Sequence, residues 1–268
     1  MRRILMTIQQ QFANNVVKAV TGDEGIIGLA VAGSWLTNEI DEFSDLDLIL
    51  VTRNKVGGER SKMLNVAKRF GKLLSGFTGE HVGEPRVLIC LYDNPLLHVD
   101  IKFVTLDEFR QRIETPVILL DTNGALQQIL STTEPRFPCP DYQWIEDRFW
   151  TWVHYALLKI GRGEYLEAFD FLGFLRMVVF GPLLHIRNGN LPRGVRKVET
   201  QLLPDDFARL KSTIPAYSPT SLLNSLQCAV NLYRDLRITL FSNNVILQKE
   251  TEEKVMFYFE EIQSKQAL

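Results

Sequence analysis

The sequence predicts an α+β protein in which a mixed sheet with helices, residues 1–132, is followed by an all-α helical bundle, residues 140–268. Strand and helix patterns intermix in the first half, whereas only helical periodicity is found after Trp144. Between the halves, the stretch Ser131–Asp141 holds three prolines and no periodic pattern, which is typical of a domain boundary. The length of 268 residues is compatible with two modest domains.

The first half contains apolar runs of two kinds. Residues 6–20 and 61–74 carry apolar side chains at helical spacing, and the strand-like runs are 26–32, 46–52, 86–92, 97–104 and 117–121. Asp93-Asn94-Pro95 is typical of a turn, so the third and fourth strands are expected to form a hairpin. Thr105 and Glu108 fit a capping box, which predicts a short helix after the fourth strand.

The second half predicts helices over residues 142–161, 164–187, 203–212, 219–242 and 250–264. Gly161-Arg162-Gly163 and Arg187-Asn188-Gly189 supply two of the breaks between them. The pattern therefore indicates a bundle that contains helices alone.

The composition, with 46% hydrophobic and 23% charged residues, is that of an ordinary soluble protein. The net charge of −2 argues against a protein held to nucleic acid by bulk charge, so nucleic acid is not an expected partner. Three scattered cysteines without metal-ligand spacing, and the lack of a secretory signal, predict a cytoplasmic location with reduced thiols. No segment approaches the ~20 apolar residues needed to span a bilayer, so no membrane partner is expected.

Two aspartates, Asp45 and Asp47, stand one residue apart at the start of the apolar run Leu48–Val51. Side chains alternate along a strand, so both carboxylates point the same way. Like charges this close repel each other, and a divalent cation compensates them best. Mg²⁺ binds one or two carboxylates together with phosphate oxygens of a substrate. A solvated strand start, with Ser44 or Asp45 capping a turn, would show the same residues.

Two further features favour a site for a metal ion and a nucleotide. Gly33-Ser34 follows a buried strand, where glycine lets the backbone approach a phosphate and serine adds a donor, although an ordinary strand-to-helix turn uses the same residues. Asp100 lies within the strand-like run LLHVDIKFV, on the face shared with His98 and Lys102. A carboxylate in this position is costly unless it is paired or metal-bound. Pairing with His98 or Lys102 on an exposed face is the alternative.

The order of strand, Gly-Ser, Asp-x-Asp and a later lone Asp resembles the nucleotidyltransferase superfamily of DNA polymerase β. The superfamily signature is hG-[GS]-x(7–13)-Dh-[DE]-h. Here it reads AGSWLTNEIDEFSDLDLIL, followed by HVDIK, and the resemblance covers residues 26 to 104. The second half, around RFWTWVHYALLKIGRGEYLEA, looks like the helical half of bacterial lincosamide and aminoglycoside antibiotic nucleotidyltransferases, with a looser match.

The resemblance implies a metal-dependent enzyme in which an acceptor hydroxyl attacks the α-phosphorus of a nucleoside triphosphate and pyrophosphate leaves. It implies two Mg²⁺ ions, ~4 Å apart, at the attacking and leaving oxygens. Asp45, Asp47 and Asp100 would be the catalytic and metal-binding residues. Gly33 and Ser34 would bind the β- and γ-phosphates.

In the helical half, the resemblance implies that Lys159 can reach the triphosphate, although a solvent-facing lysine would look the same in the sequence. A separate general base is not singled out. Four acidic residues stay open for that role, because each could equally be a solvated helix charge: Glu146, Asp147, Glu164 and Glu167.

The expected function is transfer of AMP from ATP to a hydroxyl of a small molecule, such as an aminoglycoside or lincosamide antibiotic, and hence antibiotic resistance. Transfer to a protein or an RNA is one alternative, and a non-catalytic nucleotide-binding regulator of the same fold is another. The long helical half argues against short antitoxin-type relatives. All three carboxylates are present, so nothing points to lost catalysis. The acceptor, the nucleobase and the oligomeric state, a homodimer included, stay open.

Overall fold

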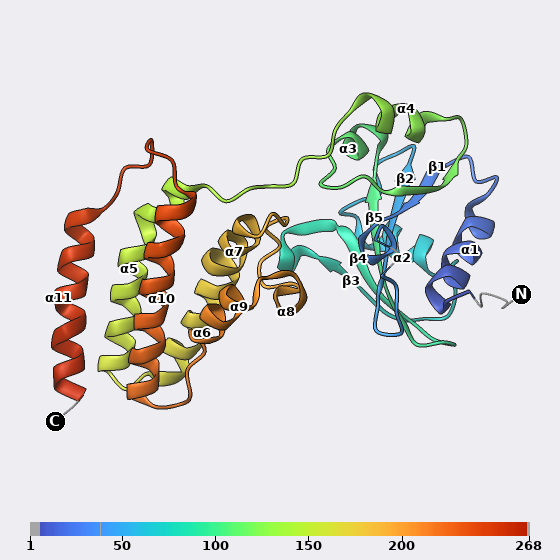
Figure 1. Ribbon diagram of the computed structural model, residues 1–268. Helices are drawn as coiled ribbons and strands as arrows, with labels where there is room; N and C mark the ends of the chain where they lie inside the picture. Colours follow the sequence, from blue (N-terminus) through green and yellow to red (C-terminus); the bar gives the residue numbers. More distant parts are fainter. Residues whose placement is uncertain (1–5, 38, 267–268) are drawn as a thin grey trace, which may run out of the picture. The chain divides into compact units, whose positions relative to one another are not determined.

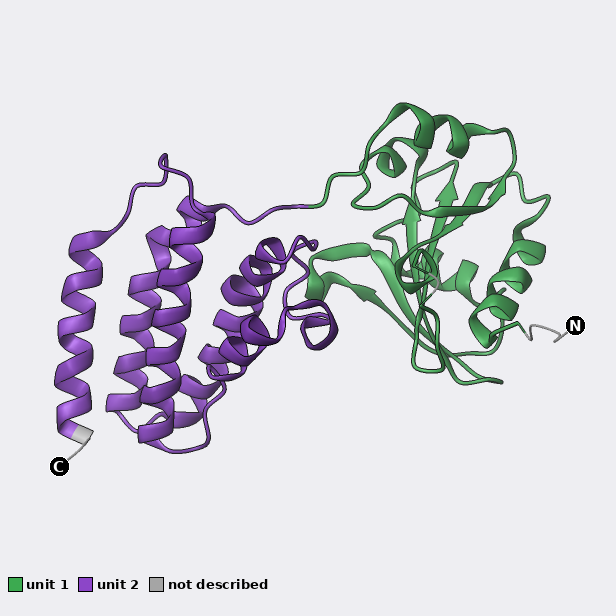
Figure 2. Cartoon of the chain, in the orientation of Figure 1, with its two compact units in different colours: residues 1–137 green, residues 138–268 purple. Residues whose placement is uncertain are grey.

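The computed structural model of the chain, which describes residues 6–37 and 39–266, is α+β, as the sequence predicts. It divides into two compact units, Met1–Phe137 (unit 1) and Pro138–Leu268 (unit 2), shown in Figure 2. The division lies inside the stretch that holds three prolines. Within the described residues, all strands belong to the first unit, and the second is helical.

Unit 1 is built on a six-stranded mixed sheet with the order β3-β4-β5-β2-β1-β6 (Figure 1). The strands are β1 (Ile26–Val31), β2 (Leu46–Thr52), β3 (Leu73–Gly79), β4 (Glu84–Tyr92), β5 (Leu97–Val104) and β6 (Val117–Asp121). Every neighbouring pair is antiparallel except β2 and β5, which run parallel. The starts of β2 and β5 therefore lie at the same edge of the sheet.

Helices cover the two faces of this sheet to different extents. On one face, α1 (Ile8–Val20) and α2 (Arg60–Ala67) pack with the large core that includes Leu48 and Ile101. On the other, α3 (Leu106–Arg110) and α4 (Ala125–Thr132) cover a smaller cluster around Val51 and Val104. Side chains alternate along a strand, so Asp47 and Asp100, four residues before these two valines, share the less covered face.

Local signals in unit 1 are confirmed where they depend on near neighbours. The capping box at Thr105 and Glu108 begins α3. Strands β4 and β5 form the predicted antiparallel hairpin. Two short 3-10 turns, η1 (Gly33–Trp35) and η2 (Glu80–Val82), complete the unit.

The predicted helix over residues 61–74 is wrong in its second half, because α2 ends at Ala67 and β3 begins at Leu73. Strand β3 lies at the edge of the sheet, where Leu74 and Phe77 stay exposed, so its apolar residues do not alternate cleanly. It also passes close to α2: a Cβ on Gly76 would lie 2.7 Å from Cδ2 of Leu64.

Unit 2 contains the helices α5 (Tyr142–Gly161), α6 (Tyr165–Leu175), α7 (Gly181–Arg187), α8 (Val198–Gln201), α9 (Pro204–Lys211), α10 (Pro219–Leu240) and α11 (Lys249–Gln266). They surround one core that includes Trp150, Phe180 and Tyr233. A π-helical turn, η3 (Arg176–Phe180), joins α6 to α7, so the predicted helix over 164–187 is one run with a wider turn inside it. The four-residue helix α8 was not predicted.

One helical run, Tyr165–Arg187, is long and apolar enough by length and composition to cross a membrane, with a mean hydropathy of 1.5. The expectation that no segment approaches this length was therefore wrong. Half of its most apolar window is buried inside unit 2, which is also the behaviour of a core helix.

Candidate functional site

Asp47 on β2 and Asp100 on β5 are direct partners in the register of the parallel pair. Neighbouring strands lie ~4.8 Å apart, so the two carboxylates project from adjacent backbone positions. Both residues are half-buried, whereas Leu48 and Ile101 beside them point into the core. The alternation of β2 and β5 therefore places two like charges side by side on one face of the sheet.

The charged groups around Asp100 include the third predicted carboxylate, Asp45. Burial raises the pKa of Asp100, a nearby His98 opposes the rise, and the charge of Asp45 adds to it. Nε2 of His98 lies 3.0 Å from Oδ1 of Asp100. Lys102 pairs with Glu84 at 2.9 Å. Of the two expected alternatives for Asp100, the contact with His98 is thus present. Asp45, which precedes β2 and is half-buried, lies close enough for its charge to act on Asp100.

Gly33 lies against Asp47. Its φ of +65° is in the left-handed region, and a Cβ built on it would lie 2.0 Å from Oδ2 of Asp47. The N–H of Ala32 donates to the carbonyl of Asp47 at 3.0 Å, which fixes the turn beside the start of β2. Only glycine allows this approach. Ser34 follows in η1, which consists of one 3-10 turn, and its side chain is half-buried.

Sequence reasoning missed one acidic residue in this site, Glu114. The N–H of Gly33 donates to Oε1 of Glu114 at 3.0 Å. Glu114 lies in the loop before β6, and β6 pairs with β1 so that Val117 faces Val31, two residues before Gly33. No local pattern marks Glu114. Only the pairing of two strands that are distant in the sequence brings it to the Gly-Ser turn.

The residues fit divalent cations in the type of their donors. Carboxylate oxygens are the ligands that Mg²⁺ prefers, and Gly33 leaves the space that the carboxylate of Asp47 fills. Within residues 6–37 and 39–266, however, no group of three or more His, Cys, Asp or Glu side chains is arranged to hold a metal ion. A cation bound by all three aspartates would therefore draw their side chains closer together.

Lys159, on α5, is held by two carboxylates of its own unit. Its Nζ lies 2.6 Å from Glu164 and 3.0 Å from Glu167, and the side chain is only 15% exposed. Hydrogen bonds to these two residues raise the pKa of Lys159. The hydroxyl of Tyr155 also donates to Glu167. The predicted contact of Lys159 with a nucleotide stays a prediction, and it would compete with both ion pairs.

Four acidic residues were left open as a separate general base, and one of them, Glu146, is excluded because it is fully buried. The residue has no exposed surface. Its carboxylate accepts hydrogen bonds from the Tyr233 hydroxyl at 2.5 Å, the Gln248 N–H at 2.9 Å and Arg237 at 3.3 Å. Asp147 is exposed and accepts a bond from the side chain of Gln143 at 2.7 Å. Glu146 therefore has a structural role in unit 2.

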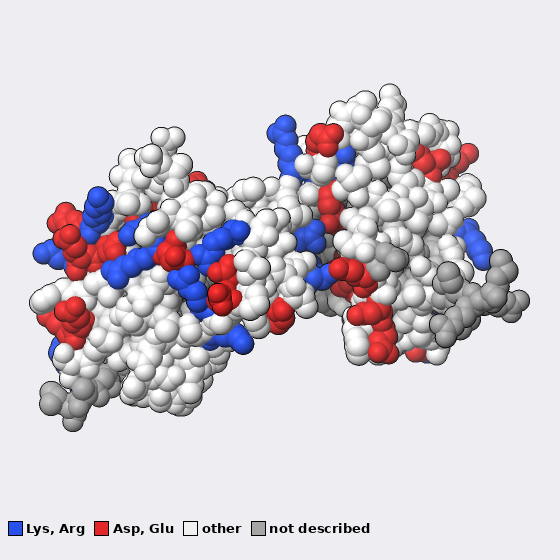
Figure 3. All heavy atoms as spheres, viewed as in Figure 1, with Lys and Arg blue, Asp and Glu red and all other residues white. Residues whose placement is uncertain are grey.

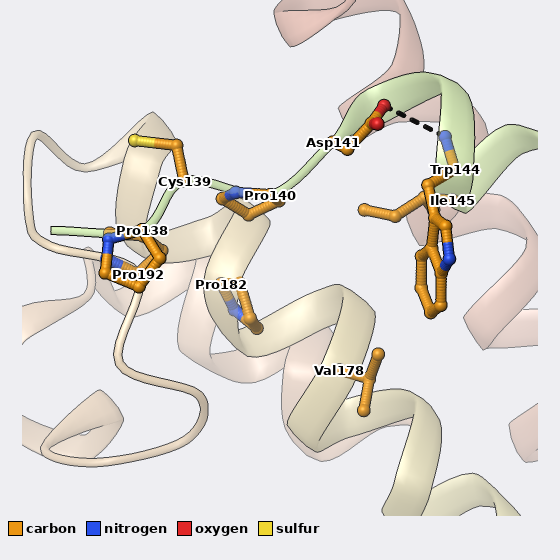
Figure 4. Close-up of a pocket in the computed structure, with 9 residues that line it drawn as sticks. All are labelled: Pro138, Cys139, Pro140, Asp141, Trp144, Ile145, Val178, Pro182 and Pro192. Atoms are coloured by element: carbon orange, nitrogen blue, oxygen red, sulfur yellow. Dashed lines mark hydrogen bonds between the residues drawn. The ribbon is translucent and has the colours of Figure 1, made fainter.

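One hollow and the visible face of unit 2 (Figure 3) show no gathering of basic side chains that would mark a phosphate or nucleic-acid site. A hollow of about 270 Å³, shown in Figure 4, is lined by Pro138, Cys139, Pro140, Asp141, Trp144, Ile145, Val178, Pro182 and Pro192. It has no basic side chain, and Asp141 caps α5 through the Trp144 N–H. On the face of unit 2 visible in Figure 3, basic and acidic side chains are mixed.

Comparisons with known proteins find little similarity in sequence. No protein-family model and no curated protein matches the chain. Among solved structures, it is similar to an aminoglycoside 6-adenyltransferase from Bacillus subtilis, with 17% identity and a TM-score of 0.41 over 97% of this chain and 99% of that one. This level of similarity is too low to assign the activity of that enzyme to this chain.

Proposed function

We propose that the chain is a metal-dependent nucleotidyltransferase that transfers AMP from ATP to a hydroxyl of a small molecule and releases pyrophosphate. The observation that carries the proposal is the in-register pairing of Asp47 and Asp100, with Gly33 closed against Asp47. Two carboxylates in this position repel each other and lose hydration. A role in binding cations together with a triphosphate accounts for their placement.

Each residue of the site has a role in this proposal. Asp45, Asp47 and Asp100 would hold two Mg²⁺ ions, which stabilise charge on the attacking and leaving oxygens. The N–H of Gly33 and the hydroxyl of Ser34 would bind the β- and γ-phosphates. The acceptor oxygen forms a bond to the α-phosphorus, the bond from that phosphorus to the bridging oxygen breaks, and pyrophosphate leaves. The proton of the acceptor hydroxyl goes to the carboxylate of Asp100.

We further propose that the acceptor is a hydroxylated antibiotic of the aminoglycoside or lincosamide type. The segment before β2 carries Glu39, Asp41 and Glu42, all exposed, and such charge suits a polycationic acceptor. The three cysteines form no disulfide and Cys139 is exposed, which agrees with action in the cytoplasm. The protein would then contribute to antibiotic resistance.

Calorimetric titration of MgATP tests the site. Wild type is compared with the double variant Asp45→Ala, Asp47→Ala and with the control Asp107→Ala, which removes a carboxylate of unit 1 whose side chain is 98% exposed. Magnesium-dependent binding is expected in wild type and control and should disappear in the double variant. Equal binding in all three proteins would reject the proposed role of the aspartates.

Pyrophosphate release in the presence of single aminoglycosides or lincosamides then tests the reaction. Pyrophosphate release that requires an acceptor and is lost when Asp100 is replaced supports nucleotidyl transfer. Binding of MgATP without release for any acceptor tested would favour a nucleotide-binding regulator.

A further inference from the structure

We propose that Glu114 competes with the triphosphate for the backbone N–H of Gly33, so that the nucleotide-free site is held closed by a carboxylate of its own chain. The inference rests on the proposed function, because it concerns the same phosphate-binding turn. It assigns to Glu114 a role that neither the signature motif nor any local pattern contains.

The competition follows from the number of donors at Gly33. A backbone amide carries one N–H, and here it donates to Oε1 of Glu114 at 3.0 Å. Carboxylate and phosphate oxygens are both charged acceptors and seek the same donors. The bond to Glu114 shows that this N–H faces a position that an anionic oxygen can occupy. A phosphate oxygen that takes this position must displace the carboxylate.

Like the hydrogen bond of Glu114, the negative charge around Gly33 opposes binding of the triphosphate. Oδ2 of Asp47 would lie 2.0 Å from a Cβ on Gly33, and Oε1 of Glu114 lies 3.0 Å from its nitrogen. With ordinary bond lengths, these two carboxylate oxygens are no more than about 8 Å apart. Two negative groups thus flank the turn before any triphosphate arrives, and a triphosphate adds further negative charge. Withdrawal of Glu114 reduces this repulsion.

The position of Glu114 in the fold permits its withdrawal without loss of the sheet. The residue belongs to the loop between α3 and β6, and it is half-buried. The loop is anchored on both sides, by Arg112, which donates to Thr133, and by Val117, which pairs with Val31. Rotation of the Glu114 side chain alone removes Oε1 from the N–H of Gly33. The strand pairing between β1 and β6 stays intact.

Only molecules in which the Gly33 N–H is free can bind the polyphosphate. The apparent affinity is therefore the intrinsic affinity multiplied by the fraction of such molecules. If the carboxylate occupies the donor in about nine molecules out of ten, removal of Glu114 tightens binding about tenfold. Glu114→Ala removes both charge and acceptor. Glu114→Gln removes the charge but keeps an amide oxygen that can still accept the bond, so it should lie between Glu114→Ala and wild type.

Inorganic tripolyphosphate with Mg²⁺ is the probe, and the amide resonance of Gly33 in the ¹⁵N-glycine-labelled full chain is the readout. Both Glu114 variants should shift this resonance in the absence of ligand. The half-saturating concentration of tripolyphosphate should fall about tenfold in Glu114→Ala. Glu134→Gln, which neutralises an exposed carboxylate of the same unit, should leave both quantities unchanged. Circular dichroism checks that each variant is folded.

An unchanged or higher half-saturating concentration in Glu114→Ala would overturn the inference, and so would a Gly33 resonance that tripolyphosphate leaves in place in every protein. Weaker binding in both Glu114 variants would show that the carboxylate positions the turn for the ligand. The proposed function fails separately. If MgATP binding depends on Asp45 and Asp47 but does not respond to Glu114, only the role of Glu114 is wrong. If no protein shows aspartate-dependent MgATP binding, the proposed function itself is rejected.

Discussion

Replacement of Gly33 by alanine tests the site through a single methyl group. The new Cβ would lie 2.0 Å from Oδ2 of Asp47, and real Cβ atoms do not come closer than 3.0 Å to such neighbours. The carboxylate must therefore retreat by about 1 Å. A misplacement of this size at a reacting centre costs on the order of 100-fold in rate. We expect Gly33→Ala to lose nucleotidyl transfer by at least this factor.

Backbone strain contributes separately and can be measured by itself. Alanine in the left-handed region costs about 1–2 kcal/mol. Gly83 has a similar φ, +77° against +65° for Gly33, and no described atom lies within 4 Å of its Cβ. Gly83→Ala is thus a matched control that carries the strain without the collision with Asp47.

Urea unfolding and MgATP titration are measured for both variants. Gly83→Ala should lower the free energy of unfolding by about 1–2 kcal/mol and keep its nucleotide binding. Gly33→Ala should lose at least as much stability and also lose magnesium-dependent binding. If Gly33→Ala binds MgATP and transfers AMP as well as Gly83→Ala does, Asp47 is not the group that the reaction needs at this place.

Two further predictions concern charges away from the proposed site. Glu146→Ala should lower the free energy of unfolding of unit 2 by about 1–3 kcal/mol, because it leaves the buried hydroxyl of Tyr233 without its acceptor; Asp147→Ala, at the next, exposed position, should change it by less than about 0.5 kcal/mol, and similar values for both in urea unfolding would contradict the structural role of Glu146. The pKa of Glu84 is lowered from 4.5 to about 2, chiefly by a hydrogen bond from Arg86. A lowered folded-state pKa gives stability that is present above about pH 4.5 and lost as the pH falls toward 2. Melting temperature against pH should therefore show an acid-dependent loss that is smaller in Glu84→Gln, and identical curves for both proteins would refute this.

The sequence predicted those parts of unit 1 in which short-range pattern and tertiary structure agree. Strands β2 and β5 are apolar runs interrupted at alternate positions, so the shared face of Asp47 and Asp100 follows from the period of a strand, whereas Asp45 precedes β2 and its shared orientation with Asp47 stays a prediction. The pairing of Asp47 with Asp100 could be predicted only from the order of the strands in the sheet. No local pattern could supply that order.

The remaining features depend on contacts between distant segments. Glu114 reaches Gly33 only because β6 lies beside β1. Lys159 looked like a free helix cation, yet the break after α5 turns α6 back toward it and brings Glu164 and Glu167 into contact. In both cases the partner of a charged residue is set by the path of the chain. Pattern reasoning has no access to such partners.

The spacer between Trp35 and Asp45 has a different consequence for the history of the protein. Its distal end is fastened to α1, where the side chain of Gln9 donates to the carbonyls of Asp41 and Ser44 at 3.0 and 2.7 Å. The pairing of β1 with β2 fixes the strands on either side. Insertions or deletions before Asp41 can therefore accumulate over generations without moving the three carboxylates. If the proposed function holds, such a chain can drift toward new acceptors while the three carboxylates keep their places.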